Sequence, residues 1–114
     1  MIMIRITMRA LMEKHKEVMQ TLLSIIEPTG KEKGCLSYHV FQDIENRNLF
    51  SLLGEWNTRE DLDCHIKSDR FAVLLGTKSL LHEPLSIQIH TVSDSEGMEM
   101  VNALRNQSSL ILSI

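Results

Sequence analysis

The sequence has 114 residues, of which 43% are apolar and 24% are charged, and we therefore expect one globular domain rather than a disordered chain. Its net charge is −3, with acidic and basic residues interspersed along the chain. This charge pattern argues against binding to nucleic acids or to anionic membrane surfaces.

The sequence also predicts a cytoplasmic protein. The N-terminal run MIMIRITM is interrupted by Arg5 and is too short for a signal peptide, and no stretch approaches the roughly 20 apolar residues that span a bilayer. The two cysteines, Cys35 and Cys64, lie far apart and form no CxxC pair. We expect them to be reduced thiols rather than a disulfide or a metal site.

The first predicted element is a strand over residues 1–8. Its even positions carry isoleucines and a methionine, and its odd positions include Met3, Arg5 and Thr7. From residue 11 the apolar spacing becomes that of a helix, with the stripe Leu11, His15, Val18, Leu22 and Ile25. Pro28 interrupts this pattern, and Gly34 closes the segment.

Three further strands and two short helices follow. The segments CLSYHVFQ and LFSLLGEW read as strands joined by a polar loop over residues 43–48. Thr58 and Ser68 are good N-caps for two short helices, Pro84 ends the second, and LSIQIHTV alternates as a last strand. The order strand-helix-strand-strand-helix-helix-strand predicts an α+β, ferredoxin-like fold with a four-stranded antiparallel sheet.

The predicted sheet is apolar on both faces. Leu49 and Leu53 point away from Phe50 and Trp56, yet all four are apolar. If helices covered only one face, the other face should be polar. Because it is not, we predict a homodimer in which a second copy covers the back of the sheet.

We assign residues 1–93 to this domain and residues 94–114 to a C-terminal extension. Residues 95–105 have a helical pattern, and the closing run SLILSI has high β-propensity and little charge. Such a run would promote aggregation if it were left free, so we expect the extension to contact the partner subunit. The alternative is a frayed tail.

Residues 34–71 carry the most recognisable pattern. They contain GCLSYHVFQD, LFSLLGEW and NTREDLDCHIKSDRF, and the markers are Gly34-Cys35, Glu55-Trp56 and the spaced residues Leu62, His65, Ser68 and Phe71. This pattern resembles the antibiotic-biosynthesis-monooxygenase superfamily of dimeric α+β barrels over about residues 2 to 92. Its members include cofactor-free oxygenases of anthrones and quinols, haem-degrading enzymes and an autoinducer-processing isomerase.

Comparison with individual branches of the superfamily narrows the range of expected cofactors and pocket types. In the haem-degrading branch, the positions of the iron-ligating histidine and of a site tryptophan correspond here to Leu75 and His65. Leucine cannot ligate iron, and no HxH or HxxxH pair is present, so we expect no cofactor and no metal. In the actinorhodin-type anthrone oxygenase, two polar substrate-holding positions correspond to Leu52 and Leu62, which implies a more apolar pocket.

The predicted catalytic residues are His65, Trp56 and Asp61. His65 lies one helical turn after Asp61, whose carboxylate would hold one ring nitrogen and leave the other to act as a base. Trp56 ends a strand and can direct its indole N–H into the cavity. The predicted apolar substrate-binding residues are Phe50, Leu52, Leu62, Phe71 and Leu75.

Plainer readings stay open for these residues. Trp56 can be an aromatic core residue whose N–H is satisfied, and His65 with Asp61 can be an ion pair on a helix surface. We interpret the charge run 31–33 as a solvated helix end.

The leading hypothesis for function is a cofactor-independent monooxygenase of small aromatic or quinol-type substrates. The alternatives are a non-enzymatic protein that binds or senses a small apolar molecule, and an isomerase that acts on a small signal molecule.

Overall fold

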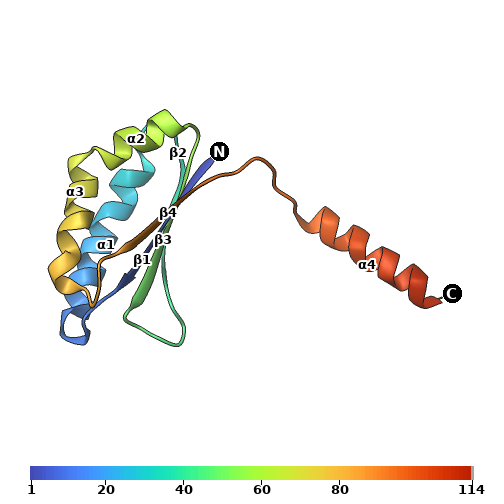
Figure 1. Ribbon diagram of the computed structural model, residues 1–114, viewed down its shortest axis with the longest axis horizontal. Helices are drawn as coiled ribbons and strands as arrows, with labels where there is room; N and C mark the ends of the chain where they lie inside the picture. Colours follow the sequence, from blue (N-terminus) through green and yellow to red (C-terminus); the bar gives the residue numbers. More distant parts are fainter. Residues whose placement is uncertain (114) are drawn as a thin grey trace.

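The computed structural model describes residues 1–113, with side chains described through residue 107. A four-stranded antiparallel sheet in the order β2-β3-β1-β4 carries three helices on one face (Figure 1). The elements are β1 (Ile2–Arg9), η1 (Met12–Lys14), α1 (His15–Gly30), β2 (Cys35–Gln42), β3 (Leu49–Trp56), α2 (Arg59–Ile66), α3 (Asp69–Leu75), η2 (Gly76–Leu80), β4 (Ser86–Thr91) and α4 (Met98–Ser113). This order confirms the predicted α+β, ferredoxin-like fold.

The two central strands bring their apolar residues to the same face. In β1 and β3 alternate residues are buried, as the period-two pattern of the sequence predicts. The register places Ile6 opposite Leu52 and Met8 opposite Phe50, so these side chains meet under the helices. Trp56 ends β3 opposite Ile2, at the end of the sheet that α2 adjoins.

The helices follow the predicted caps and most of the predicted stripe, but α1 begins at His15, after the 3-10 turn η1, rather than at Leu11. Val18, Leu22 and Ile25 are the buried apolar residues of α1, which packs on β2. This helix continues two residues past Pro28 to Gly30, although the proline has no N–H to donate to the carbonyl four residues earlier. Thr58 and Ser68 cap α2 and α3 as predicted.

The face of the sheet opposite these helices is not covered by the domain itself. Met3, Leu49 and Leu53 lie on it half-buried, and the neighbouring Phe41 side chain is 52% exposed. A hollow of about 460 Å³ opens among Met3, Arg5, Phe41, Leu53 and other residues of this face. Apolar side chains are therefore present on the uncovered face, among polar ones such as Arg5 and Ser51, and the partner subunit that would cover them stays a prediction.

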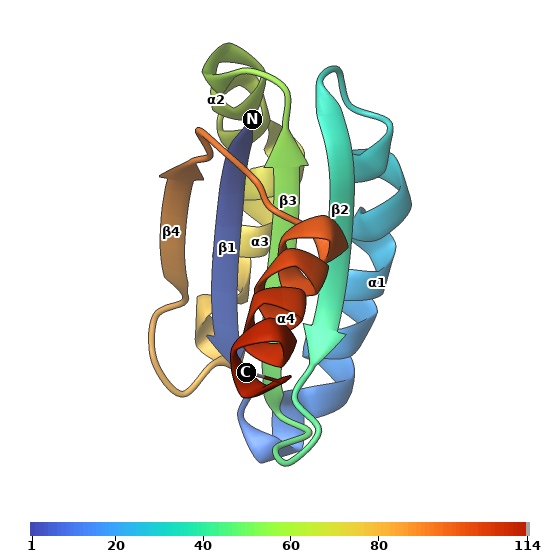
Figure 2. The same ribbon diagram turned by 90° about the vertical axis from the view of Figure 1, so that its right-hand side faces the viewer.

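The C-terminal helix α4 stands away from the domain. Residues 92–97 lead out from β4, and α4 projects beyond the uncovered face of the sheet (Figures 1 and 2). Residues 109–113, whose composition favours a strand, continue this helix. How the side chains of the SLILSI run pack, and the structure of residue 114, lie outside the described residues.

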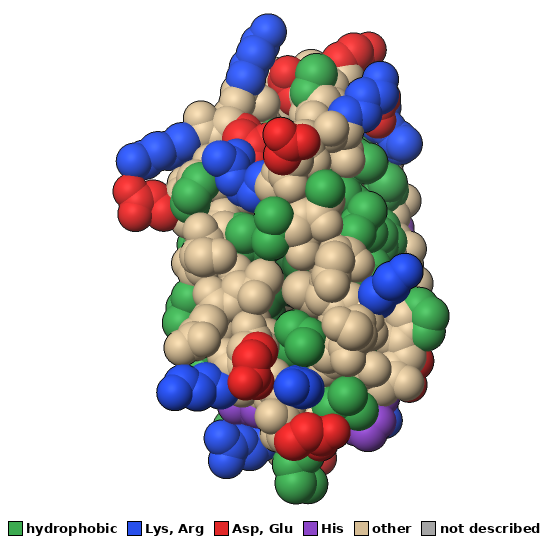
Figure 3. Space-filling view, turned by 90° about the vertical axis from the view of Figure 1, so that its left-hand side faces the viewer, with side chains coloured by type: hydrophobic (Ala, Val, Ile, Leu, Met, Phe, Trp, Pro, Cys, Tyr) green, Lys and Arg blue, Asp and Glu red, His purple; other side chains and the backbone are tan. Residues whose placement is uncertain are grey.

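Charges on the helix-covered face are mixed. Figure 3 shows acidic and basic side chains next to one another on it, without a patch of a single sign. In the part of the chain that the structure describes, no helix combines the length and the apolar character needed to cross a membrane.

Candidate active site

The His65 imidazole is surrounded by aromatic rings. His65 is 3% exposed and lies on the buried side of α2. The ring stacks on the Trp56 indole with centroids 4.7 Å apart and an interplanar angle of 26°. Phe71 and Tyr38 approach with their rings nearly perpendicular, at 5.3 Å and 6.1 Å. Three apolar surfaces thus exclude water from a titratable ring, as a general base in a dry site requires.

The carboxylate that binds His65 is Glu32 rather than the predicted Asp61. Both oxygens of Glu32 lie 3.1 Å from His65 Nδ1. A carboxylate only accepts hydrogen bonds, so Nδ1 carries the proton in this contact, and the neutral ring keeps its lone pair on Nε2. Glu32 is only 19% exposed at its side chain, so the interpretation of this segment as a solvated helix end is wrong for Glu32.

Arg70 also binds the Glu32 carboxylate. Its Nη1 donates to Glu32 Oε2 at 2.7 Å, and its own side chain is 35% exposed. The cluster joins three elements, because Glu32 follows α1, His65 lies on α2 and Arg70 lies on α3. A charge-assisted bond of this length is among the stronger hydrogen bonds in proteins.

Asp61 has a structural position at the start of α2. Its backbone N–H donates to the capping hydroxyl of Thr58 at 3.1 Å. Its side chain lies directly against Gly34, so closely that a Cβ at this glycine would overlap the carboxylate. Gly34 also has a φ of +79°, a conformation that glycine adopts without strain. Asp61 therefore packs against the turn before β2.

Trp56 and Tyr38 are the two buried polar groups whose rings lie beside His65. Trp56 is fully buried, and among the described residues its Nε1–H has no hydrogen-bond partner. Tyr38 is 6% exposed and points toward the helices, whereas His39 is exposed on the other face of β2. Burial, followed by the negative charge of Glu32, raises the pKa of Tyr38 well above its usual value, so the phenol stays neutral even at alkaline pH.

The structure places the predicted substrate-binding residues at different distances from His65. Phe71 contacts His65 directly, and Leu52 and Leu62 are buried in the core. Phe50 is buried against His15, six positions from Trp56 along β3 and hence about 20 Å away. Leu74 takes the buried position of α3 and Leu75 turns outward, where it is 45% exposed, so the structure does not bring Leu75 to His65.

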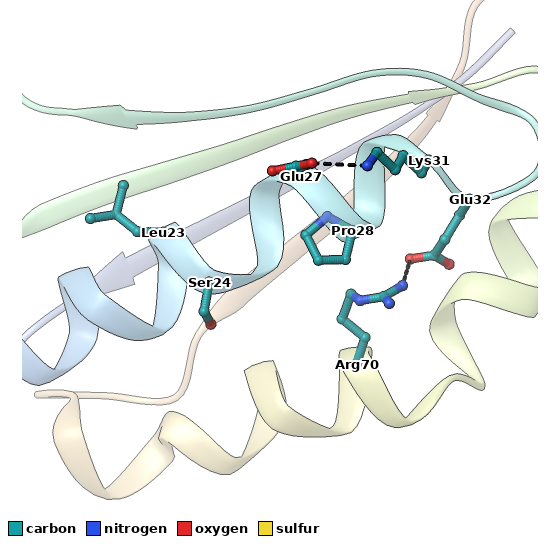
Figure 4. A pocket seen from close by; sticks show the side chains of 7 residues that line it. All are labelled: Leu23, Ser24, Glu27, Pro28, Lys31, Glu32 and Arg70. Carbon is teal, nitrogen blue, oxygen red and sulfur yellow. Dashed lines mark hydrogen bonds and ion pairs between the residues drawn. The ribbon is translucent and has the colours of Figure 1, made fainter.

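An open pocket adjoins the charged side of this cluster. A cavity of about 700 Å³ lies between the end of α1 and the start of α3 (Figure 4). It is lined by Leu23, Ser24, Glu27, Pro28, Lys31, Glu32 and Arg70. Glu32 therefore lines this pocket, while its carboxylate accepts a hydrogen bond from the buried imidazole of His65.

Sequence reasoning missed Glu32, Arg70 and Tyr38. The contact between Glu32 and His65 spans 33 positions, and that between Glu32 and Arg70 spans 38, so neither has a local signature. The alternation of β2 left Tyr38 and His39 equally placed to face the helices. Among the residues described, no group of three or more His, Cys, Asp or Glu side chains is arranged to hold a metal ion.

Comparisons with known proteins identify the family. A protein of Deinococcus radiodurans, provisionally named an antibiotic biosynthesis monooxygenase, superposes with a TM-score of 0.78 at 22% identity, over 85% of this chain and 97% of that one. A conserved Methanosarcina mazei protein is 34% identical over 78% of this chain and 89% of its own, with a TM-score of 0.73.

An uncharacterized protein of Synechocystis sp. is 28% identical over 87 residues, which are 75% of this chain. This chain spans only 59% of that relative's length. The model of the family described as antibiotic biosynthesis monooxygenase matches residues 1–74, which include every member of the His65 cluster. Because this match covers more than half of the sequence, the chain belongs to the antibiotic biosynthesis monooxygenase family.

Proposed function

We propose that this protein is a cofactor-independent monooxygenase of small aromatic, quinol-type substrates. The observation that carries the proposal is the buried His65 imidazole, which is enclosed by aromatic rings and bonded at Nδ1 to a carboxylate. This arrangement leaves Nε2 of the neutral ring as the base. Membership of the monooxygenase family supports the same reaction class.

The reaction needs only a proton acceptor and a dry site. His65 Nε2 takes the acidic proton of the substrate, so that the O–H or C–H bond breaks and an N–H bond forms. The resulting electron-rich anion reduces O₂. One oxygen atom stays in the oxidised product and the other leaves as water.

Trp56 is suited to hold the oxygen of the substrate. A buried donor without a partner costs about 1–3 kcal/mol, and a substrate oxyanion would satisfy the indole N–H at the place where negative charge develops. The rings around His65 must separate to admit such a molecule, because His65 and Trp56 are both almost fully buried.

We propose that the active form is a cytoplasmic homodimer. The uncovered apolar face of the sheet supports a second copy as the cover, in line with the dimeric barrels of the superfamily that the sequence resembles. Both cysteines are free thiols, which suits a reducing compartment.

Oxygen consumption with an anthrone and with a hydroquinone tests the reaction. We expect substrate-dependent uptake by the purified protein and a fall of about 10²–10⁴ in turnover for His65→Ala, the range for a lost general base. The exposed His82 offers the control variant His82→Ala, which should keep full turnover. Uptake that is unchanged in His65→Ala would contradict the assignment.

A second candidate is a protein that binds a small apolar molecule without turnover. Leu52 and Leu62 favour it, because both positions are apolar and almost fully buried, whereas the related oxygenase has polar residues there. Binding by calorimetry in the absence of any oxygen uptake would identify this function.

A further inference from the structure

Glu32 connects the buried base to a fixed cation at the protein surface. One oxygen of Glu32 is shared between His65 Nδ1 and Arg70 Nη1, at 3.1 Å and 2.7 Å, and the other lies 3.1 Å from Nδ1. The exposure of the three side chains rises from 3% for His65 through 19% for Glu32 to 35% for Arg70. The three side chains therefore lead from the interior to the pocket that Glu32 and Arg70 line (Figure 4).

We propose that Glu32 is the positioning residue of His65 and that Arg70 keeps Glu32 in place. The inference rests on the proposed function, because it takes His65 as the base. Glu32 lies in the turn after α1, where its side chain would otherwise have many rotamers. The bond from Arg70 restricts these rotamers to the one that meets the imidazole.

This contact has two consequences for the chemistry of His65. It selects the tautomer with the proton on Nδ1, which leaves the Nε2 lone pair for the substrate. When Nε2 accepts the substrate proton, the ring becomes an imidazolium, and the negative charge of Glu32 compensates the new positive charge. The Nδ1 proton stays on the imidazole, so no further proton moves.

The pocket also contains a matched control. Glu27 pairs with Lys31 at 2.9 Å, and both side chains are largely exposed, at 80% and 73%. Glu27 lines the same pocket as Glu32 but bonds Lys31 rather than His65 (Figure 4). Glu27→Ala therefore removes a carboxylate from the same cavity without touching the imidazole.

Nitrogen-15 NMR of the imidazole, recorded at neutral pH without substrate, tests the tautomer directly. We expect His65 of the wild-type protein to show its proton on Nδ1. The spectrum of Glu32→Ala should shift toward the Nε2–H tautomer, and that of Glu27→Ala should match the wild type. A wild-type His65 with its proton on Nε2, or an unchanged spectrum in Glu32→Ala, would overturn the role of Glu32.

Turnover and rescue complete the test. We expect kcat of Glu32→Ala to fall by about 10²-fold, at the lower end of what a positioned base contributes, with KM little changed. Sodium formate can enter the open pocket, and we expect it to raise the turnover of Glu32→Ala and to restore the Nδ1–H signal. Loss of turnover without rescue of either readout would indicate a purely structural residue and refute the proposal.

The two readouts separate the inference from the proposed function. A wild-type protein without oxygen uptake refutes the monooxygenase, whereas a wrong tautomer refutes the role of Glu32. If Glu32→Ala does not fold, the wild-type tautomer alone decides.

Discussion

The Trp56 indole lies nearly parallel to the His65 imidazole, with ring centroids 4.7 Å apart. This contact joins the last residue of β3 to the buried side of α2. It places a donor without a partner beside the ring that we propose as the base. The orientation of the indole should therefore matter both for stability and for catalysis.

Gly54 leaves the room that this indole occupies. A Cβ at Gly54 would lie 3.0 Å from Trp56 Nε1, 3.1 Å from Ile4 Cγ2 and 3.2 Å from Tyr38 Cδ1. We expect Gly54→Ala to lower the free energy of unfolding by about 1–3 kcal/mol, the usual cost of overpacking a core. Urea denaturation measures the change. Gly76→Ala is the control, since no atom lies within 4 Å of its added Cβ, and equal losses in both variants would contradict this account.

The buried phenol of Tyr38 should make stability depend on alkaline pH. Burial first and the charge of Glu32 second raise the pKa of Tyr38 in the folded protein above the value of about 10 in an unfolded chain. Folding therefore favours the protonated phenol. Its contribution to the free energy of unfolding is fully present below about pH 10 and is lost as the pH rises further.

The variant Tyr38→Phe isolates this contribution. We expect its free energy of unfolding to decline less steeply above about pH 10 than that of the wild type, in urea titrations at several pH values. Parallel curves for the two proteins would show that another group causes the alkaline loss.

The uncovered sheet face should be the dimer interface. Leu53 is central on this face, in β3, so Leu53→Lys places a charge where the two sheets would meet. Sedimentation equilibrium at micromolar concentration should give about twice the chain mass for the wild type and a monomer for Leu53→Lys. Val73→Lys is the control, because Val73 is an exposed apolar residue of α3 on the helix layer. A monomeric wild type would contradict the interface.

We propose that α4 contacts the partner subunit. It stands away from its own sheet (Figure 1), and Met98 and Val101 are exposed on it, at 69% and 47%. Deletion of residues 98–114 removes this helix and leaves β4 intact, so we expect weaker dimerisation with little change in the fold of the sheet. A truncated protein with the same dimer dissociation constant and melting temperature would show that α4 does not contribute to pairing.

The sequence was sufficient where the structure depends on local spacing. The alternation in β1 and β3, the stripe of α1 and the caps at Thr58 and Ser68 are all confirmed, because each depends on residues a few positions apart. The burial of Trp56 and His65 followed from the same patterns.

The remaining features of the site depend on the tertiary fold. Asp61 was the only carboxylate one helical turn before His65, yet the fold brings Glu32 from 33 positions away to the imidazole. Leu74 and Leu75 are one residue apart, which is about 100° of rotation around the helix. In a helix as short as α3, the apolar pattern of the sequence does not decide which of the two leucines is buried. Both differences come from contacts between elements rather than within them.

Isotope labelling with ¹⁸O₂ tests the central claim most directly. The claim is that His65 deprotonates a quinol-type substrate and that the resulting anion reacts with O₂ without a cofactor. Under ¹⁸O₂, mass spectrometry of the product formed by the purified protein should show one labelled oxygen atom per turnover, with the other recovered in water. His65→Ala should form labelled product more slowly by about 10²–10⁴-fold. A product whose new oxygen comes from water, or equal labelling rates in the two proteins, would contradict the account.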